Sequence, residues 1–155
     1  MKARRFREVP RNTASKGHLQ IYSLLKDIFP YHEIYQEYPY SKILALSYKH
    51  CKVDKRYQDS YLLKAGNRLF ADIFNATYQF VIEVQGEQHY RPISWSNKED
   101  LDAALKRFYT QKRTDGIKRS ISKEACVKLI ELSYKELKSV DKKFIMDLLK
   151  GTNNG

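Results

Sequence analysis

Hydrophobic positions at helical and strand-like spacing divide most of the chain into elements. Apolar residues recur at helical spacing from about Ser15 onward and predict a helix that Pro30 closes. The following segment, 33–40, alternates loosely between apolar and polar residues and predicts a strand that ends near Pro39. The N-terminal part therefore predicts a helix followed by a strand.

The middle of the chain contains its most strand-like text. The segments LFADIF (69–74) and YQFVIEV (78–84) predict two strands, separated by residues 75–77, a connection of hairpin length. The apolar run ILAL (43–46) predicts either a strand or a helical turn. The basic, tyrosine-rich segment 48–68 predicts an excursion that contacts a polyanion, with a solvated surface loop as the alternative.

The C-terminal half predicts a helix over 98–112, a third over 113–123, a strand over 127–134 and a last helix over 138–150. Gly151 supplies the residue type that commonly ends a helix. The predicted fold class is therefore α/β, with a mixed central sheet flanked by helices. We expect a flexible basic arm at 1–13 and one domain over 14–150, with an insertion at about 41–68.

Composition and charge indicate which partners to expect. The 155 residues are 42% hydrophobic and 30% charged, as in a soluble globular protein. The 29 Lys and Arg against 18 Asp and Glu give a net charge of +11, which favours a polyanion such as nucleic acid. No apolar run approaches the roughly 20 residues that span a bilayer, and the N-terminal segment lacks the apolar part of a secretory signal. The expectation is a DNA-binding protein with no membrane partner and a cytoplasmic location.

Cysteine usage agrees with an intracellular compartment. Cys51 and Cys126 lie far apart and form no CxxC pair, which favours reduced thiols over a disulfide or a zinc site. Basic residues in the arm, in the excursion and after the predicted hairpin are the candidates for DNA contact: Arg4, Arg5, Lys49, Lys52, Lys55, Arg56, Arg68, Arg91 and Lys118.

The predicted hairpin also carries candidate chemistry. Asp72 lies on its first strand and Glu83 on its second, and Gln85 follows two positions later on the same face as Glu83. Antiparallel pairing brings such positions close enough to share one ion. Two neighbouring carboxylates repel unless a cation lies between them, and Mg²⁺ or Mn²⁺ suits oxygen ligands. Such an ion can activate water, so the set, with His89 beyond the strand, predicts phosphodiester hydrolysis.

The spacing of Asp72, Glu83 and Gln85 resembles the PD-(D/E)XK nuclease superfamily, whose core is an αβββαβ sandwich. The text LFADIF, VIEVQGEQHYRPI, QKRTDGIK and KLIELSY is similar to a lineage of phage and large-virus proteins related to the very short patch repair endonuclease and to a phage homing endonuclease (the EDxHD lineage). The resemblance spans roughly residues 14–148. It implies that Asp72 and Glu83 bind the metal and that His89 acts as a general base or contacts the phosphate.

The resemblance implies further candidates and shows departures. Asp115 and Lys118 match the Asp-x-x-Lys of a helix motif, and Glu87 lies within GEQHY. Gln85 stands where the superfamily usually has lysine, and His18 stands where the first helix usually has glutamate. Glu37 or Glu33, on the following strand, would then supply the missing carboxylate.

Two other functions compete with a Mg²⁺-dependent DNA endonuclease of the homing or another site-specific type. One is a catalytically inactive nuclease fold that only binds DNA, and the other is a nuclease selective for branched junctions. A chain this small would cover a long site or cut both strands only as a homodimer or higher homo-oligomer, which is a further expectation.

Overall fold

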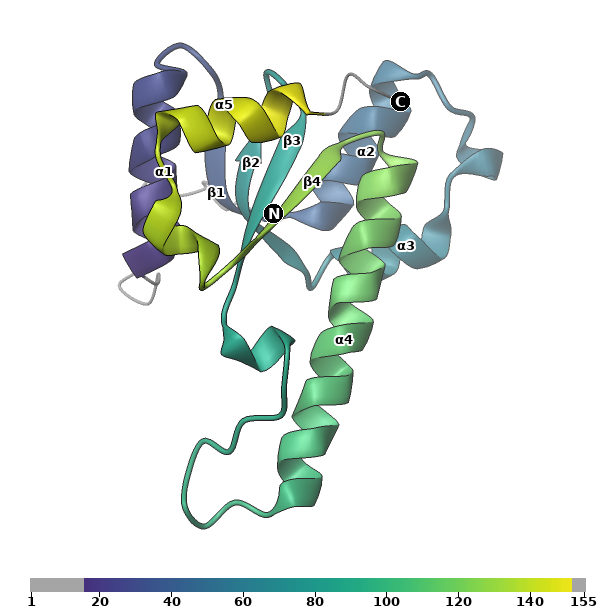
Figure 1. The fold of residues 1–155 in the computed structure, drawn as a ribbon. Helices are drawn as coiled ribbons and strands as arrows, with labels where there is room; N and C mark the ends of the chain where they lie inside the picture. Colours follow the sequence, from purple (N-terminus) through teal and green to yellow (C-terminus); the bar gives the residue numbers. More distant parts are fainter. Residues whose placement is uncertain (1–15, 152–155) are drawn as a thin grey trace, which may run out of the picture. The chain divides into compact units, whose positions relative to one another are not determined.

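The computed structural model describes residues 16–151 of the 155-residue chain. The predicted basic arm, with Arg4 and Arg5, lies outside the described residues. In chain order, the helices and strands are α1 (Lys16–Ile28), β1 (Ile34–Pro39), α2 (Tyr40–His50), α3 (Ser60–Gly66), β2 (Phe70–Asn75), β3 (Phe80–Gln85), α4 (Leu101–Glu124), β4 (Lys128–Ser133) and α5 (Lys142–Lys150) (Figure 1). Short 3₁₀ turns lie at Lys55–Tyr57, Glu87–His89 and Glu136–Ser139. The predicted α/β class is confirmed.

The described chain forms two compact units, which we describe separately. Unit 1 contains residues 16–38, 71–84 and 130–151, and unit 2 contains residues 39–70 and 85–129. The division follows packing density, and the expectation of a single domain over 14–150 stays a prediction.

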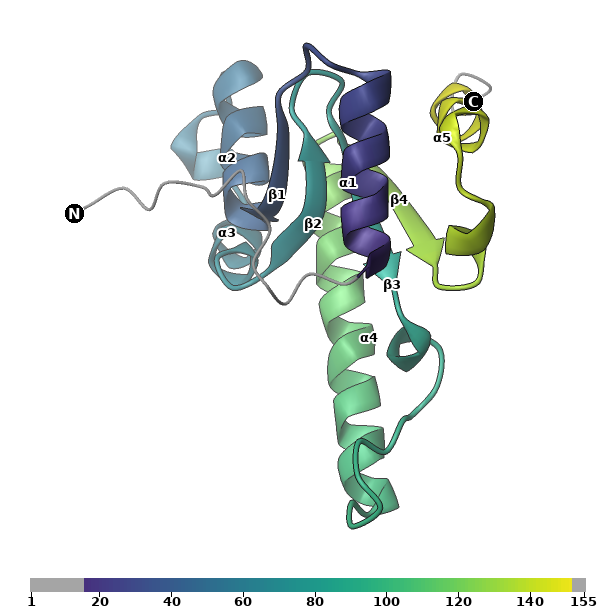
Figure 2. The same ribbon diagram turned by 90° about the vertical axis from the view of Figure 1, so that its left-hand side faces the viewer.

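Unit 1 is built on a sheet with the strand order β1-β2-β3-β4. The β2–β3 pair is an antiparallel hairpin in which Ile73 pairs with Ile82 and Asn75 with Phe80, which confirms the predicted hairpin. The chain runs the same way along β3 and β4 and the opposite way along β2, so the sheet is mixed, as predicted (Figure 2).

The aliphatic core of unit 1 lies on one face of this sheet. Helices α1 and α5 contribute Ile21, Leu25 and Ile145 to it, and the strands contribute Ile73, Ile82 and Leu132, among others (Figures 1 and 2). Burying each such side chain stabilises the fold by about 1.5–3 kcal/mol. The opposite face also buries apolar side chains, among them Phe74 and Val81, which pair across the hairpin.

Unit 2 is a packed group of the helices α2, α3 and α4. Gly66 ends α3 against the backbone of α2, where a Cβ would lie 2.7 Å from the Ser41 nitrogen. The Tyr48 hydroxyl accepts a 2.9 Å hydrogen bond from the Asp59 N–H and donates to Glu124 at 3.5 Å. One tyrosine on α2 thus links the start of α3 to the end of α4.

The segment 43–46 is helical, so the strand alternative is wrong. Its apolar residues belong to a helical stripe in which Tyr40, Ile43, Leu44 and Tyr48 are buried on one side of α2. The excursion 48–68 is not a plain loop either, because it contains α3, whose first turn is capped by the Asp59 carboxylate.

Two further helix predictions need correction. The helices predicted over 98–112 and 113–123 are one helix, α4, because no proline interrupts them and Gly116 has open space around it. Asp100 caps this helix by accepting the Ala103 N–H at 2.8 Å. The last helix begins at Lys142 rather than 138, because Asp141 caps it, and Val140 stays buried before it.

Cys51 and Cys126 are free thiols, as predicted. Over residues 16–151, no helix combines the length and the apolar character that a membrane span requires.

Candidate active site

Asp72 and Glu83 lie on neighbouring strands of unit 1 and point to the same face. Ile73 and Ile82 pair across the hairpin and both belong to the aliphatic core. Because side chains alternate along a strand, the adjoining Asp72 and Glu83 point to the other face of the sheet. Continuing the register by one residue sets them opposite each other, where Cβ atoms lie about 5 Å apart.

The two carboxylates have different surroundings. Asp72 is partly exposed, and its Oδ2 accepts the Val84 N–H at 2.8 Å. Glu83 is only 5% exposed, so it is not a surface residue. A carboxylate buried to that extent depends on cations or hydrogen-bond donors for its stability, which suits a charge-binding role.

Glu37 lies on β1, the strand that neighbours β2. The Ala76 N–H donates to the Glu33 carbonyl at 2.9 Å, so Glu33 lies at the hairpin-turn end of β2. Glu37 has a φ of 50°, a left-handed conformation that locally interrupts the alternation of β1. Glu33 lies beside the hairpin turn, about 13 Å along β2 from Asp72, and is not placed to share an ion with it.

His18 lies on the stripe of α1 that faces the aliphatic core. It is 7% exposed and shares that stripe with Ile21 and Leu25. The core occupies one face of the sheet, and the Asp72 and Glu83 side chains point to the other face. His18 therefore packs on the face of the sheet that does not carry these two carboxylates.

Gln85 ends β3 and belongs to unit 2. It is 5% exposed, and its Oε1 accepts a 2.8 Å hydrogen bond from the Tyr90 hydroxyl. This bond ties the segment that follows β3 to the end of the strand. It also holds the Gln85 amide in one orientation.

His89 and Asp115 form a hydrogen-bonded pair in unit 2. The Nδ1 atom of His89 lies 3.0 Å from Oδ2 of Asp115, and the Asp115 side chain is 4% exposed. Gln111 donates to the other Asp115 oxygen at 2.8 Å. An ionised carboxylate accepts hydrogen bonds only, so Nδ1 carries the proton, and Nε2 is the nitrogen at which neutral His89 can accept a proton.

Glu87 and Lys118 have local partners. Glu87 forms an ion pair with Arg91 one helical turn later. The Lys118 ammonium lies 5.5 Å from the ring centroid of Tyr40, and its side chain is half-buried. Lys118 is therefore part of the packing between α4 and α2.

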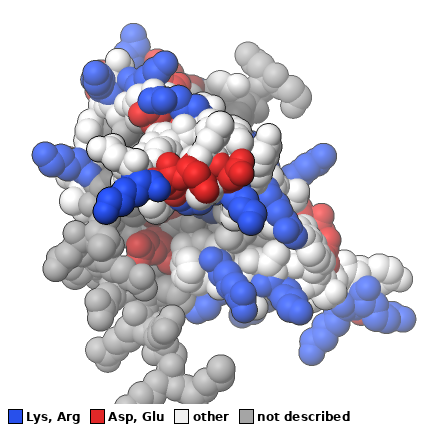
Figure 3. All heavy atoms as spheres, turned by 90° about the horizontal axis from the view of Figure 1, so that it is seen from below, with Lys and Arg blue, Asp and Glu red and all other residues white. Residues whose placement is uncertain are grey.

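The remaining predicted DNA contacts in the described chain are on the surface of unit 2. Arg56 is held by Asp54, whose pKa is lowered by that ion pair. Figure 3 shows Lys and Arg side chains widely spread over one face and Asp and Glu in small groups. The excess of basic side chains agrees with the net charge of +11. The exposed candidates are Lys49, Lys52, Lys55, Arg56, Arg68 and Arg91.

Among residues 16–151, no three His, Cys, Asp or Glu side chains converge closely enough to hold a metal ion by themselves. Mg²⁺ characteristically uses only one or two carboxylates and completes its shell with water and substrate phosphate oxygens. The hard oxygen donors of Asp72 and Glu83 fit that mode of binding.

Sequence reasoning missed Tyr90 and Gln111 as partners of the predicted residues. Gln111 and Asp115 are four residues apart on one helix, a spacing at which side chains meet, so this contact had a sequence signal. Tyr90 had none, because its contact depends on the turn at Glu87–His89.

Comparisons with known proteins identify no relative. No family model, no curated protein and no solved structure matches the chain.

Proposed function

We propose that this protein is a metal-dependent DNA endonuclease that hydrolyses phosphodiester bonds. The observation that carries the proposal is the position of Asp72 and Glu83 on adjacent antiparallel strands, on the face away from the aliphatic core. Asp72 is partly exposed and Glu83 is buried on the neighbouring strand. A shared cation supplies a physical reason for this pairing, since it removes the repulsion between them.

In this proposal Asp72 and Glu83 hold Mg²⁺ or Mn²⁺, with Glu37 on the neighbouring strand β1 as the additional carboxylate. Such an ion, when bound, activates water and neutralises charge on the phosphodiester. Asp72 keeps its orientation through the Val84 N–H, and the burial of Glu83 strengthens its attraction to any cation.

His89 is the proposed general base or acid. Asp115 holds the ring through Nδ1 and stabilises it when it becomes protonated, and Gln111 fixes Asp115 in turn. The Nε2 atom then takes a proton from water or donates one to the leaving oxygen. This is the arrangement of a base oriented by a carboxylate.

The proposed substrate is DNA, approached through the exposed basic residues of unit 2. Lysine and arginine on a +11 protein neutralise phosphates without reading sequence, so they would supply affinity rather than specificity. A homodimer is the proposed means of cutting both strands.

The same proposal places the chain with the PD-(D/E)XK nucleases and with the EDxHD lineage of phage proteins. It would be a site-specific enzyme in the cytoplasm of a bacterium or of a phage-infected host. The order of elements supports it: a helix, three strands, a helix and a strand follow one another once α2 and α3 are counted as the inserted segment. The fold proposed is accordingly the αβββαβ sandwich.

One observation favours a DNA-binding protein without catalysis. Gln85 stands where the superfamily usually has lysine, it carries no charge, and its amide oxygen is engaged by Tyr90. A nuclease that lacks this cation retains its metal ligands but loses one source of transition-state stabilisation.

Incubation of the protein with supercoiled plasmid and Mg²⁺ or Mn²⁺ tests these alternatives. We expect nicking that EDTA abolishes. The substitutions Glu83→Gln and Asp72→Asn should also abolish nicking, and both variants should keep the DNA affinity of the wild type in a gel shift. Cleavage by Glu83→Gln at the wild-type rate would refute the metal assignment. A salt-sensitive gel shift without nicking in either metal would establish the binding protein instead.

A further inference from the structure

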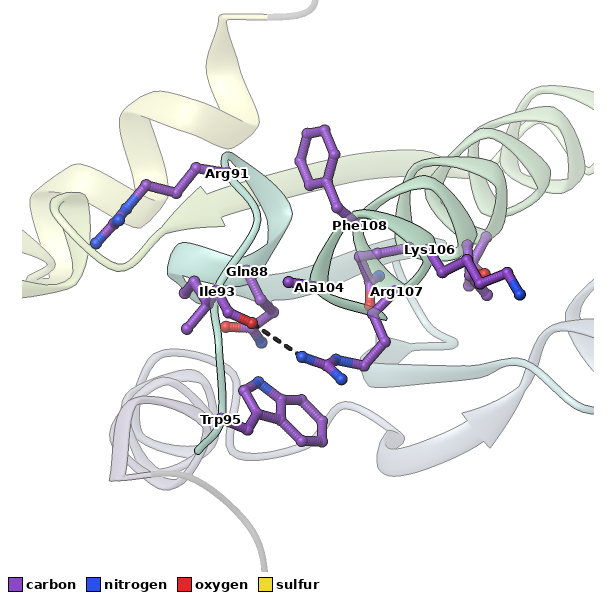
Figure 4. Close-up of a pocket in the computed structure, with 11 residues that line it drawn as sticks. Gln88, Arg91, Ile93, Trp95, Ala104, Lys106, Arg107 and Phe108 are labelled. Atoms are coloured by element: carbon purple, nitrogen blue, oxygen red, sulfur yellow. Dashed lines mark hydrogen bonds between the residues drawn. The ribbon is translucent and has the colours of Figure 1, made fainter. Parts of the chain in front are cut away.

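A hollow in unit 2 lies between the segment that follows β3 and the first half of α4. Its volume is about 450 Å³, and Figure 4 shows side chains from both segments around it. The surface that lines it is mostly apolar, although most of the residues that contribute to it are polar or charged. The residues that matter for its chemistry are Gln88, Trp95, Lys106, Arg107, Phe108 and Gln111.

Trp95 is exposed and yet held in place. Its side chain is 74% exposed, while the Arg107 guanidinium lies 4.5 Å from its ring centroid. Arg107 is itself fixed, because it donates to the Ile93 carbonyl at 2.9 Å (Figure 4). It also donates to Glu99 at 2.6 Å. The Trp95 N–H donates to Glu99 at 2.7 Å, so backbone and ring are both positioned.

This arrangement prepares a flat aromatic surface for a ligand. Arg107 covers one face of the indole and leaves most of the ring in contact with water. An exposed indole is unfavourable in water, and its rotamer freedom is already reduced here by Arg107. Stacking of a second flat ring on it would bury that surface at a small additional entropy cost.

Charges around the hollow favour an anionic strand. Lys106 is exposed at its lining, and the Lys112 ammonium lies 5.3 Å from the ring centroid of Phe108. The charge of Arg107 is compensated by Glu99, so Arg107 acts as a support rather than as a phosphate ligand. The Gln88 amide offers a polar group suited to the edge of a base, whereas the Gln111 amide already donates to Asp115.

We propose that this hollow binds one unpaired nucleobase of a single-stranded DNA segment, with Trp95 as its stacking surface and Lys106 beside the strand's backbone. The inference deepens the proposed function and rests on it only in taking DNA as the partner. Base stacking on an aromatic side chain is tolerant of sequence, so this site would contribute affinity for unpaired DNA rather than sequence preference.

Trp95 is the single tryptophan of the chain, so its fluorescence reports this site alone. The Glu83→Gln protein is titrated in EDTA with a 12-nucleotide oligothymidylate and, separately, with a 12-nucleotide strand of abasic sites. We expect the oligothymidylate to quench the emission and to shield the ring from acrylamide, and the abasic strand to bind without either effect.

Affinity measurements complete the test. Trp95→Ala should weaken oligothymidylate binding about tenfold to a hundredfold, and Trp95→Phe should retain most of the affinity. Tyr31→Ala, at a residue 96% exposed in unit 1, is the matched control and should bind like the parent protein.

Unchanged affinity of Trp95→Ala, unchanged emission at saturation, or no binding of the oligothymidylate would overturn the inference. A further result would overturn it: without DNA, the Trp95 emission changes with protein concentration in parallel with dimer formation measured by sedimentation. The hollow would then be an interface between copies of the chain. Nicking of plasmid is measured separately. Nicking by the wild type without any effect of DNA on the Trp95 emission would refute this site and leave the nuclease proposal intact. Quenching of the Trp95 emission without nicking would support this site and refute the nuclease proposal.

Discussion

His89 and Asp115 are 26 residues apart in the chain, and their side chains meet with Nδ1 at 3.0 Å from Oδ2. The histidine follows a strand and the aspartate lies in the middle of α4. The contact fixes the histidine tautomer and therefore which nitrogen can exchange a proton with a substrate.

Asp115→Asn is expected to lower the rate of plasmid nicking at least a hundredfold, because the amide stabilises neither the tautomer nor the protonated ring. Single-turnover nicking in Mg²⁺ measures the rate, and a gel shift should show unchanged DNA affinity. Gln111→Ala, which keeps the carboxylate, is the control and should lose less than about tenfold. Equal rates for Asp115→Asn and the wild type would remove His89 from the proposed catalytic group.

Glu37→Gly separates backbone strain from ligand function. Glycine adopts the φ of 50° without the cost of a Cβ, so the free energy of unfolding should rise by about 1 kcal/mol. If Glu37 contributes to the ion site, the same variant should nick more slowly and need more Mg²⁺. Gln79→Gly, at a φ of 55° in the hairpin turn, should give the stability gain with full activity. Parallel Mg²⁺ titrations and urea unfolding provide both readouts.

Gly66 and Gly116 should respond to alanine in opposite ways. A Cβ at Gly66 would lie 2.7 Å from a backbone nitrogen of α2, so Gly66→Ala should cost about 1–3 kcal/mol of unfolding free energy. A Cβ added at Gly116, inside α4, would meet no atom within 4 Å outside the backbone of its own helix. Gly116→Ala should therefore raise the free energy of unfolding by about 0.5–1 kcal/mol through helix propensity. Urea unfolding followed by circular dichroism gives both values, and a stabilising Gly66→Ala would contradict the packing of α2 on α3.

Tyr48 links stability to alkaline pH. Burial raises the pKa of its hydroxyl above 10.0, and the nearby Glu124 carboxylate adds to that effect. A raised folded-state pKa contributes stability that is complete below pH 10.0 and is lost as pH rises toward the folded-state value. Thermal melts between about pH 8 and pH 11 should show this loss, and Tyr48→Phe should reduce it. Tyr61→Phe, at an exposed tyrosine, should melt like the wild type at each pH.

Local patterns were sufficient for the strands and for the ends of several helices. Two strand-like runs around Ile73 and Ile82, separated by a connection of hairpin length, predicted the hairpin. Antiparallel pairing then predicted that Asp72 and Glu83 lie close together. Local patterns failed at α4, where two apolar stretches in succession gave no sign that one helix carries both.

By itself, the sequence determined the α/β class, the positive charge, the antiparallel hairpin and the two carboxylates that this hairpin carries. All of these depend on residue type and on separations of a few positions. Only the tertiary structure decided that Asp115 orients His89, that Tyr90 engages Gln85 and that Arg107 presents Trp95 to solvent. Those contacts join residues through turns and helix positions that no periodicity encodes, so they exist only once each unit has packed.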